Sequence, residues 1–220
     1  MTDLSNWSKC ARPGQSPLVG RFVRAEPFQA SRDAQPLFDA IGENASLWTY
    51  IPAGPFSSAE ELEGFFTFCQ TNHNWLTYVF RSPAGEMLGT ASYMRVRPEH
   101  GSAEVGSVIF SPTLQRTPAA TEAMYLMART IFDDLGYRRY EWKCNGNNAA
   151  SKRAAERFGF TYEGTFRQDM VVKGENRDTC WYSMTDNEWP KVKHAFEAWL
   201  NPSNFDGTGT QRKKLASLRS

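Results

Sequence analysis

The sequence lacks an excess of charge of either sign and any long apolar run. Its 25 Lys and Arg residues balance 24 Asp and Glu residues, which leaves a net charge of +1. A general nucleic-acid surface needs a strongly basic chain, so we expect no nucleic-acid partner. No apolar run approaches the roughly 18–20 residues that cross a bilayer, and the polar first 20 residues contain no signal-peptide core. We therefore expect no membrane partner.

Paired cysteines are also missing. The four cysteines are isolated from one another, at Cys10, Cys69, Cys144 and Cys180. Without a CxxC pair, zinc and redox motifs are not indicated, and we expect no metal. Free thiols are typical of a reducing compartment, so the sequence predicts a cytoplasmic protein.

The chain is nevertheless rich enough in apolar residues to build a core. Of its 220 residues, 40% are hydrophobic and 14% are aromatic, which excludes a disordered chain. The length fits one domain with terminal extensions. We expect an N-terminal extension over residues 1–18, a domain over residues 19–200 and a flexible basic tail over residues 201–220.

Hydrophobic periodicity predicts the order β-α-α-β-β-β-α-β-α-β-β-α. The predicted strands cover residues 19–28, 76–81, 87–97, 103–110, 140–144, 162–172 and 179–184. The predicted helices cover residues 31–43, 57–69, 120–135, 148–158 and 189–200. Ser31 is expected to cap the first helix, and Ser57 and Glu60 have capping-box spacing at the second. Antiparallel hairpins followed by a β-α-β crossover predict an α+β fold, one mixed sheet with helices on both faces.

The loop at residues 115–121 joins a predicted strand to a long helix. Free backbone N–H groups at the positive end of a helix dipole form a natural cradle for a diphosphate. Arg116 adds a permanent charge, and Thr117 and Thr121 add hydroxyl donors. The alternative is an ordinary connection in which Thr117 caps the helix and Pro118 is its first residue.

Three motifs, in the right order, resemble the GNAT superfamily of N-acetyltransferases. The loop resembles the acyl-CoA pyrophosphate loop of that superfamily, with Pro118 in place of its first glycine. Asn148 and Ser151, followed by Gly159-Phe160, match its Asn-x-x-Ser…Gly-Phe signature. Residues 163–178 and the aromatic segment Trp48–Pro52 resemble the RimJ/RimL group, named for ribosomal-protein N-terminal acetyltransferases. The resemblance covers about residues 20–190.

The resemblance implies a GNAT fold, with acetyl-CoA as the acyl donor. In that fold two parallel strands splay apart, here residues 103–110 and 140–144, and the pantetheine arm enters the cleft between them. The cofactor-binding residues that the resemblance implies are Val108, Ile109, Phe110, Gln115, Arg116, Thr117, Ala119, Ala120, Thr121, Asn148 and Ser151.

The resemblance also suggests catalytic residues. Glu104, on the cofactor strand, matches the position of the family's glutamate base, since a carboxylate on a cleft strand can take a proton from an amine. The alternative is a surface glutamate. Glu141 and Glu163 are weaker candidates, because each can lie on a solvated face. The family's tyrosine acid is replaced by Ala155, so Ser151 is the substitute, with Tyr162 behind it.

The expected activity is transfer of an acetyl group to a primary amine by direct attack. The acceptor is an amine-bearing small molecule or a protein N-terminus, and an α-amine is preferred over a lysine side chain or a polyamine. Trp48 and Tyr50 are assigned to the acceptor site, and a monomer or homodimer is expected. The alternative is a catalytically weak acyl-CoA sensor or interaction module, favoured by Pro118 and Ala155.

Overall fold

The computed structural model describes residues 3–14 and 16–219. The strands are β1 Leu18–Val19, β2 Arg24–Pro27, β3 Leu76–Arg81, β4 Met87–Arg97, β5 Ser102–Phe110, β6 Arg139–Asn145, β7 Thr161–Val172 and β8 Glu175–Thr185. The α-helices are α1 Ala30–Leu37, α2 Ala59–His73, α3 Pro118–Arg129, α4 Ala149–Phe158 and α5 Trp189–Leu200. α1 and α3 each continue through a wider turn, Phe38–Gly42 and Thr130–Asp134.

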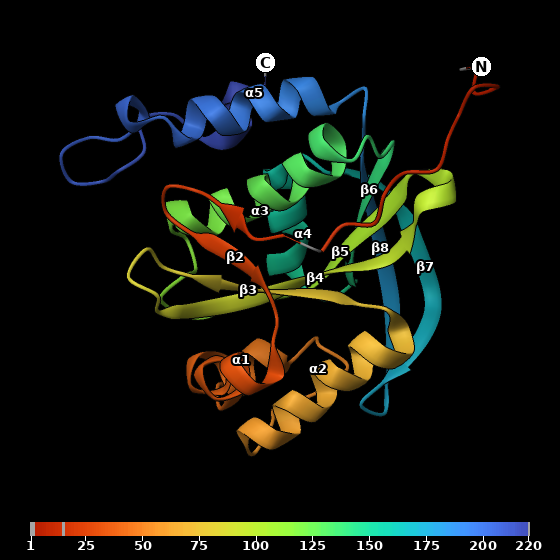
Figure 1. The fold of residues 1–220 in the computed structure, drawn as a ribbon, viewed down its shortest axis with the longest axis vertical. Helices are drawn as coiled ribbons and strands as arrows, with labels where there is room; N and C mark the ends of the chain where they lie inside the picture. Colours follow the sequence, from red (N-terminus) through yellow and green to blue (C-terminus); the bar gives the residue numbers. More distant parts are fainter. Residues whose placement is uncertain (1–2, 15, 220) are drawn as a thin grey trace.

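These strands form one sheet in the order β1-β2-β3-β4-β5-β6-β8-β7. Helices α1 and α2 lie on one side of it, and α3, α4 and α5 lie on the other (Figure 1). Each side has its own core: α1 and α2 pack against the sheet around Phe66 and Val79, and the other three helices pack around Met127 and Phe196. The predicted α+β fold with a mixed sheet is therefore confirmed.

The first predicted strand, residues 19–28, is divided into β1 and β2. A turn separates them, and the amides of Arg21, Phe22 and Val23 donate to the carboxylate of Glu122 on α3, at 2.9, 2.5 and 3.0 Å. Glu122 is buried. Local sequence could not reveal this turn, because its partner lies about a hundred residues away.

Two helix starts also differ from the expectation. α1 begins at Ala30 without a side-chain cap on Gln29, and the amide of Gln29 donates instead to Asp33 at 2.8 Å. Ser31 therefore lies inside the helix. At α2, Ser58 accepts from the amide of Glu61, and the Glu61 carboxylate accepts from the amide of Ser57. The predicted capping box exists, displaced by one residue.

Both terminal segments pack against the domain. In the N-terminal segment, the indole of Trp7 donates to the carbonyl of Glu99, and the hydroxyl of Tyr137 donates to the carbonyl of Ala11. In the basic tail, Leu215 is buried in the larger core and Arg219 donates to the carbonyl of Arg157. In the described part of the tail, one leucine and one arginine thus contact the rest of the domain.

β5 and β6 form a parallel pair that ends early. Their ladder runs from Ser102 paired with Arg139 to Val105 paired with Trp142. Beyond that point β5 continues beside β4 and β6 beside β8. Ser107 lies in a bulge of β5 with a φ of +50°. The two strands therefore separate after Val105, which leaves backbone groups on one edge of β5 free for a ligand.

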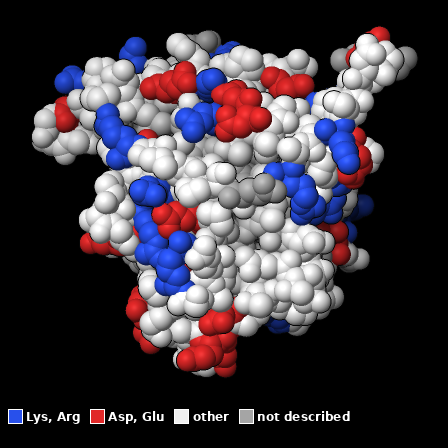
Figure 2. Space-filling model, viewed as in Figure 1, with Lys and Arg blue, Asp and Glu red and all other residues white. Residues whose placement is uncertain are grey.

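Charged side chains of both signs are interspersed over the face of the molecule seen in Figure 2. Among the described residues, no helix is both long enough and apolar enough to cross a membrane.

Candidate functional site

The loop before α3 has the geometry of an ordinary capped connection and also that of a cradle for a diphosphate. Thr117 caps the helix: its hydroxyl accepts from the amide of Ala120 at 3.2 Å and donates to the carbonyl of Leu114 at 2.6 Å. Pro118 is the first helical residue. Arg116 is exposed, and its φ of +64° turns the chain sharply just before the helix. The cap does not exclude an anion site, because Arg116 and the positive end of the helix remain available.

Two hydroxyls of this loop are occupied by protein partners. The Thr117 hydroxyl is committed to the cap, and Thr121 is only 1% exposed and accepts from Arg157 at 3.0 Å. The prediction that the Thr121 hydroxyl faces a diphosphate is therefore wrong: the helical turn directs it between α3 and α4. Gln115 donates to the carbonyl of Phe110 at 2.9 Å, which ties the loop to the end of β5.

The start of α4 lies beside the separated strands. Asn148 caps the helix by accepting from the amide of Ser151 at 2.9 Å. The hydroxyl of Ser151 accepts from the indole of Trp142 on β6 at 3.0 Å, which leaves its O–H as a donor. Trp142 is the last residue of β6 that pairs with β5. Ser151 therefore lies at the point where the two strands separate.

Glu104 lies on the opposite face of the same strand pair, because it precedes Val105 in β5. It is only 4% exposed, so the surface-glutamate alternative is wrong. Lys143 Nζ lies 2.7 Å from Glu104 Oε2. Burial raises the pKa of the Glu104 carboxyl, and the positive charge of Lys143 acts against that rise. A buried carboxyl with a raised pKa is suited to accept a proton.

Glu141 is the residue of β6 paired with Glu104, and it is also buried rather than solvated. Its Oε1 accepts from Arg97 at 3.0 Å and from Arg139 at 2.8 Å. Arg139 in turn donates two hydrogen bonds to Glu163, at 2.8 and 2.6 Å. Glu141 and Glu163 thus serve a charged network across the sheet, which makes each less suitable than Glu104 as a base.

Trp48 does not line an acceptor site. Its side chain is 0% exposed, its indole donates to the carbonyl of Ile41 at 2.9 Å, and its ring lies 4.9 Å from the ring of Phe56. The assignment of Trp48 to the substrate is therefore wrong, because this large ring fills the core between α1 and α2. The neighbouring Tyr50 is half-buried. The carbonyl of Trp48 accepts from Lys173 at 2.8 Å, which brings the β7–β8 turn to this segment.

Sequence reasoning did not place Arg95, Lys143 and Trp181 beside Glu104. Arg95 Nε lies 3.8 Å from Glu104 Oε2, and both Arg95 and Lys143 lie over the ring of Trp181, at 5.3 and 4.7 Å from its centroid. Alternation along β6 places Glu141 and Lys143 on one face, which was a usable signal. The pairing that adds Glu104, Arg95 and Trp181 to that face was not visible in the sequence.

Several buried polar atoms on these strands have no hydrogen-bond partner within the described ranges. They include Ser107 Oγ, Glu141 Oε2, Thr179 Oγ1 and Trp181 Nε1. Orphaned buried polar groups are costly and rare, and a polar ligand bound beside these strands would supply the missing partners.

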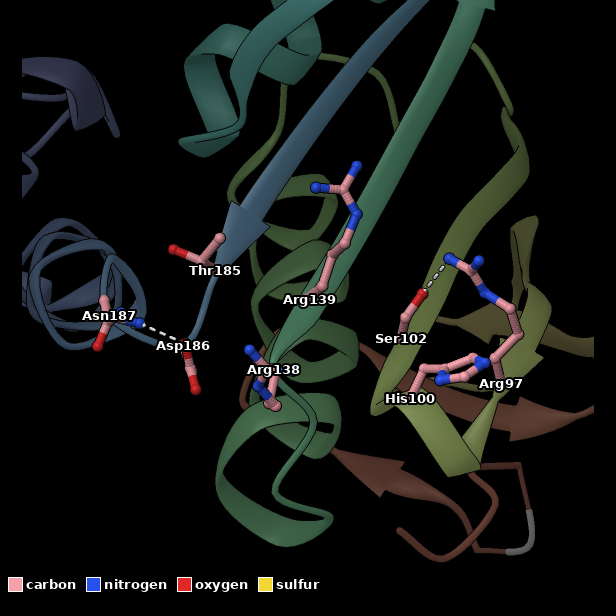
Figure 3. Close-up of a pocket in the computed structure, with 8 residues that line it drawn as sticks. All are labelled: Arg97, His100, Ser102, Arg138, Arg139, Thr185, Asp186 and Asn187. Atoms are coloured by element: carbon pink, nitrogen blue, oxygen red, sulfur yellow. Dashed lines mark hydrogen bonds between the residues drawn. The ribbon is translucent and has the colours of Figure 1, made fainter. Parts of the chain in front are cut away.

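A separate pocket of about 300 Å³ lies where β5 and β6 begin, away from the Gln115–Thr121 loop. Figure 3 shows Arg97 and Ser102 on one side of it, and Thr185, Asp186 and Asn187 on the other. Because the strands separate at their other ends, this pocket is not at the point of separation. In residues 3–14 and 16–219, no group of three or more His, Cys, Asp or Glu side chains is placed to hold a metal ion.

Comparison with known proteins agrees with this geometry. Residues 23–161 match the family model described as an acetyltransferase (GNAT) domain. A GCN5-related N-acetyltransferase from Brucella melitensis is 42% identical, with a TM-score of 0.94 and coverage of 98% of this chain and 99% of that chain. A probable acetyltransferase of the GNAT family from Chromobacterium violaceum is 39% identical, with a TM-score of 0.82 and coverage of 86% and 96%. No curated protein matches the chain.

Two more distant structures share the fold alone. One is an acetyltransferase from Salmonella typhimurium that modifies the N-terminal serine of a 50S ribosomal subunit protein; it is 20% identical, with a TM-score of 0.66 and coverage of 77% and 99%. The other is a spermidine N-acetyltransferase from Vibrio cholerae in complex with CoA and spermine; it is 17% identical, with a TM-score of 0.63 and coverage of 76% and 98%. The family match and the 42% identity to the Brucella protein show that this chain belongs to the GNAT family of acetyltransferases.

Proposed function

We propose that this protein transfers an acetyl group from acetyl-CoA to the α-amine of a small molecule or of a protein N-terminus, by direct attack. The observation that carries the proposal is Glu104, a buried carboxylate on the strand pair that separates one residue later. It lies on the face opposite Ser151, so an acceptor and a thioester can meet between the two residues.

Acetyl-CoA fits the residues on the α3 side. The exposed guanidinium of Arg116 and the positive end of α3 are suited to the diphosphate. The pantetheine arm would pair with free backbone groups of β5 at Val108, Ile109 and Phe110. Asn148 and Ser151, at the start of α4, would face the end of that arm. Ala119 and Ala120 lie in the first turn of α3, at the end of the helix proposed to face the diphosphate.

The proposed reaction needs three proton movements. Glu104 takes a proton from the ammonium form of the acceptor, and the neutral nitrogen then attacks the thioester carbonyl carbon. The C–N bond forms, the C–S bond breaks and the thiolate leaves. Ser151 donates a hydrogen bond to that leaving sulfur, because its hydroxyl already accepts from Trp142. After attack the nitrogen still carries one extra proton, which it gives up to water, and the leaving thiolate takes up a proton from water, so that the products are the neutral amide and the thiol.

Proton arithmetic favours an α-amine. A lysine-like amine, with a pKa near 10.4, costs about 4.6 kcal/mol to deprotonate at pH 7, whereas a peptide α-amine costs only about 1.0–1.4 kcal/mol. The site offers one carboxylate base, Glu104, which is paired with Lys143. The position of the family's tyrosine acid is occupied by Ala155. The RimJ/RimL-like motifs support an α-amine as well. The two distant structures act on an N-terminal serine and on spermidine, so fold similarity does not choose between these acceptors.

We expect thiol release from acetyl-CoA in the presence of α-amines, measured as kcat/KM at pH 7 over acceptors of matched size. Peptide and amino-acid α-amines should exceed spermidine and an internal lysine peptide. Faster acetylation of spermidine would overturn the acceptor class. Binding of acetyl-CoA without release in any mixture would favour the sensor module instead.

Arg116→Ala is expected to weaken acetyl-CoA binding by about 1.5–3 kcal/mol, because a charge-assisted hydrogen bond to phosphate is lost. Calorimetric titration measures the change. Arg212→Ala, which removes an exposed arginine from the tail, is the matched control and should bind as the wild type does. Equal affinity in both variants would remove Arg116 from the cofactor site.

We also place the reaction in the cytoplasm, with the protein acting as a monomer or homodimer. All four cysteines are free thiols, which is typical of a reducing compartment.

A further inference from the structure

The face of the sheet that carries Glu104 holds more cations than a site for a simple amine needs. Four cationic side chains, those of Arg95, Arg97, Arg139 and Lys143, are connected by ion pairs to three carboxylates, those of Glu104, Glu141 and Glu163. An acceptor amine arrives as a cation and leaves its proton on Glu104, which removes one negative charge from this group. A further positive charge on the acceptor is therefore repelled, and a negative charge is attracted.

Arg95 has spare binding capacity on this face. It lies in a bulge of β4, where Met94 pairs with Glu104 and Arg97 with Ser102, and its φ is +44°. A positive φ is uncommon for arginine, and bulges beside active sites re-aim side chains. Its Nε lies 3.8 Å from Glu104 Oε2 and 4.0 Å from Glu141 Oε2. In the described part of the chain, its Nη1 and Nη2 donate no hydrogen bond, and the side chain is 47% exposed.

The surroundings of Arg95 favour a planar anion. Its guanidinium carbon lies 5.3 Å from the centroid of the Trp181 ring, which holds it by a cation–π contact. The indole Nε1 of Trp181 is buried and has no hydrogen-bond partner among the described residues. Two free guanidinium nitrogens match the two oxygens of a carboxylate. Lys143 is already committed to Glu104 at 2.7 Å and does not compete for that role.

We propose that the acceptor carries a carboxylate close to its α-amine, and that Arg95 binds this carboxylate while Glu104 receives the proton from the amine. This inference rests on the proposed acetyl transfer. Because Arg95 Nε is 3.8 Å from Glu104, the carboxylate lies within a few bonds of the amine. An amino acid supplies such a group as its α-carboxylate, and a peptide supplies it as an acidic side chain near its N-terminus.

Matched acceptors test the inference. Ser-Glu-amide and Ser-Gln-amide share one α-amine and differ in a single carboxylate, and serine and serinamide form the amino-acid arm. In at least one pair, the wild type should show a kcat/KM for the acceptor with the carboxylate about ten- to a hundredfold above that for the acceptor without it. Most of this difference should come from a lower KM for the acceptor with the carboxylate. The pair that shows the larger ratio identifies the source of the carboxylate.

Arg95→Gln should reduce that ratio to within about threefold of unity, and Arg95→Lys should retain part of it. Arg212→Gln, the control on the tail, should keep the wild-type ratio. Equal rates within both pairs in the wild type, or a ratio that survives Arg95→Gln, would overturn the inference and leave acetyl transfer standing. If acetyl-CoA binds but no amine in the panel is acetylated, the proposed function fails and this inference fails with it.

Discussion

Glu104→Gln is expected to reduce kcat by about 10²–10⁴-fold, which is the usual contribution of a positioned general base. The amide keeps the size of the side chain but accepts no proton. Acetyl-CoA affinity should be unchanged, because the proposed diphosphate site at the Gln115–Thr121 loop lies beyond the far end of β5. Steady-state thiol release and calorimetric titration measure the two quantities separately.

The pH profile should identify the same group. Because burial raises the pKa of Glu104, its carboxyl takes up a proton as the pH falls toward that raised pKa, and the wild-type kcat/KM should fall with it. In Glu104→Gln this limb should disappear, and the remaining rate should rise with pH only as free amine replaces ammonium. Glu175→Gln, at the exposed β7–β8 turn, is the control. Wild-type turnover of Glu104→Gln at neutral pH would contradict the assignment.

Trp48→Ala is expected to lower the free energy of unfolding by about 3–5 kcal/mol, the typical cost of deleting a buried aromatic side chain. The ring contacts Phe56, its indole donates to Ile41, and Gly54 lies directly against it. Denaturant unfolding measures the loss.

Tyr50→Phe is the matched control for Trp48, and it should change the free energy of unfolding by about 0.5 kcal/mol or less, since it removes only a hydroxyl from a half-buried side chain. The opposite result, a stable Trp48→Ala variant with weakened acceptor binding, would return Trp48 to the acceptor site.

Local sequence was sufficient for elements whose ends are set by neighbouring residues. The spacing of hydrophobic residues and the turn at residues 82–86 predicted the ends of β3 and β4 as the structure has them. Asn148 and Gly159 marked the two ends of α4, because an N-cap side chain and a left-handed C-cap each act within one turn. The helix predicted from residue 120 begins at Pro118 with Thr117 as its cap, as in the alternative reading of the loop.

Expectations failed where a distant residue decides the outcome. Residues 19–28 read as one strand, yet Glu122 holds a turn within them. Trp48 lies in an aromatic segment that resembles a substrate wall, yet α1 and α2 enclose it. Both outcomes depend on packing between elements, which no short window of sequence contains.

The sequence by itself determined the α+β class. It also determined that a helix follows the loop at residues 115–121 and that Glu104 lies on the strand before that loop. Only the tertiary structure decided what surrounds that glutamate. The parallel register sets Glu104 beside Glu141, the bulge in β4 turns Arg95 toward both, and the β6–β8 pairing brings Trp181 under Lys143. These contacts join residues from four strands. Their register follows from the packing of the whole sheet rather than from any one strand.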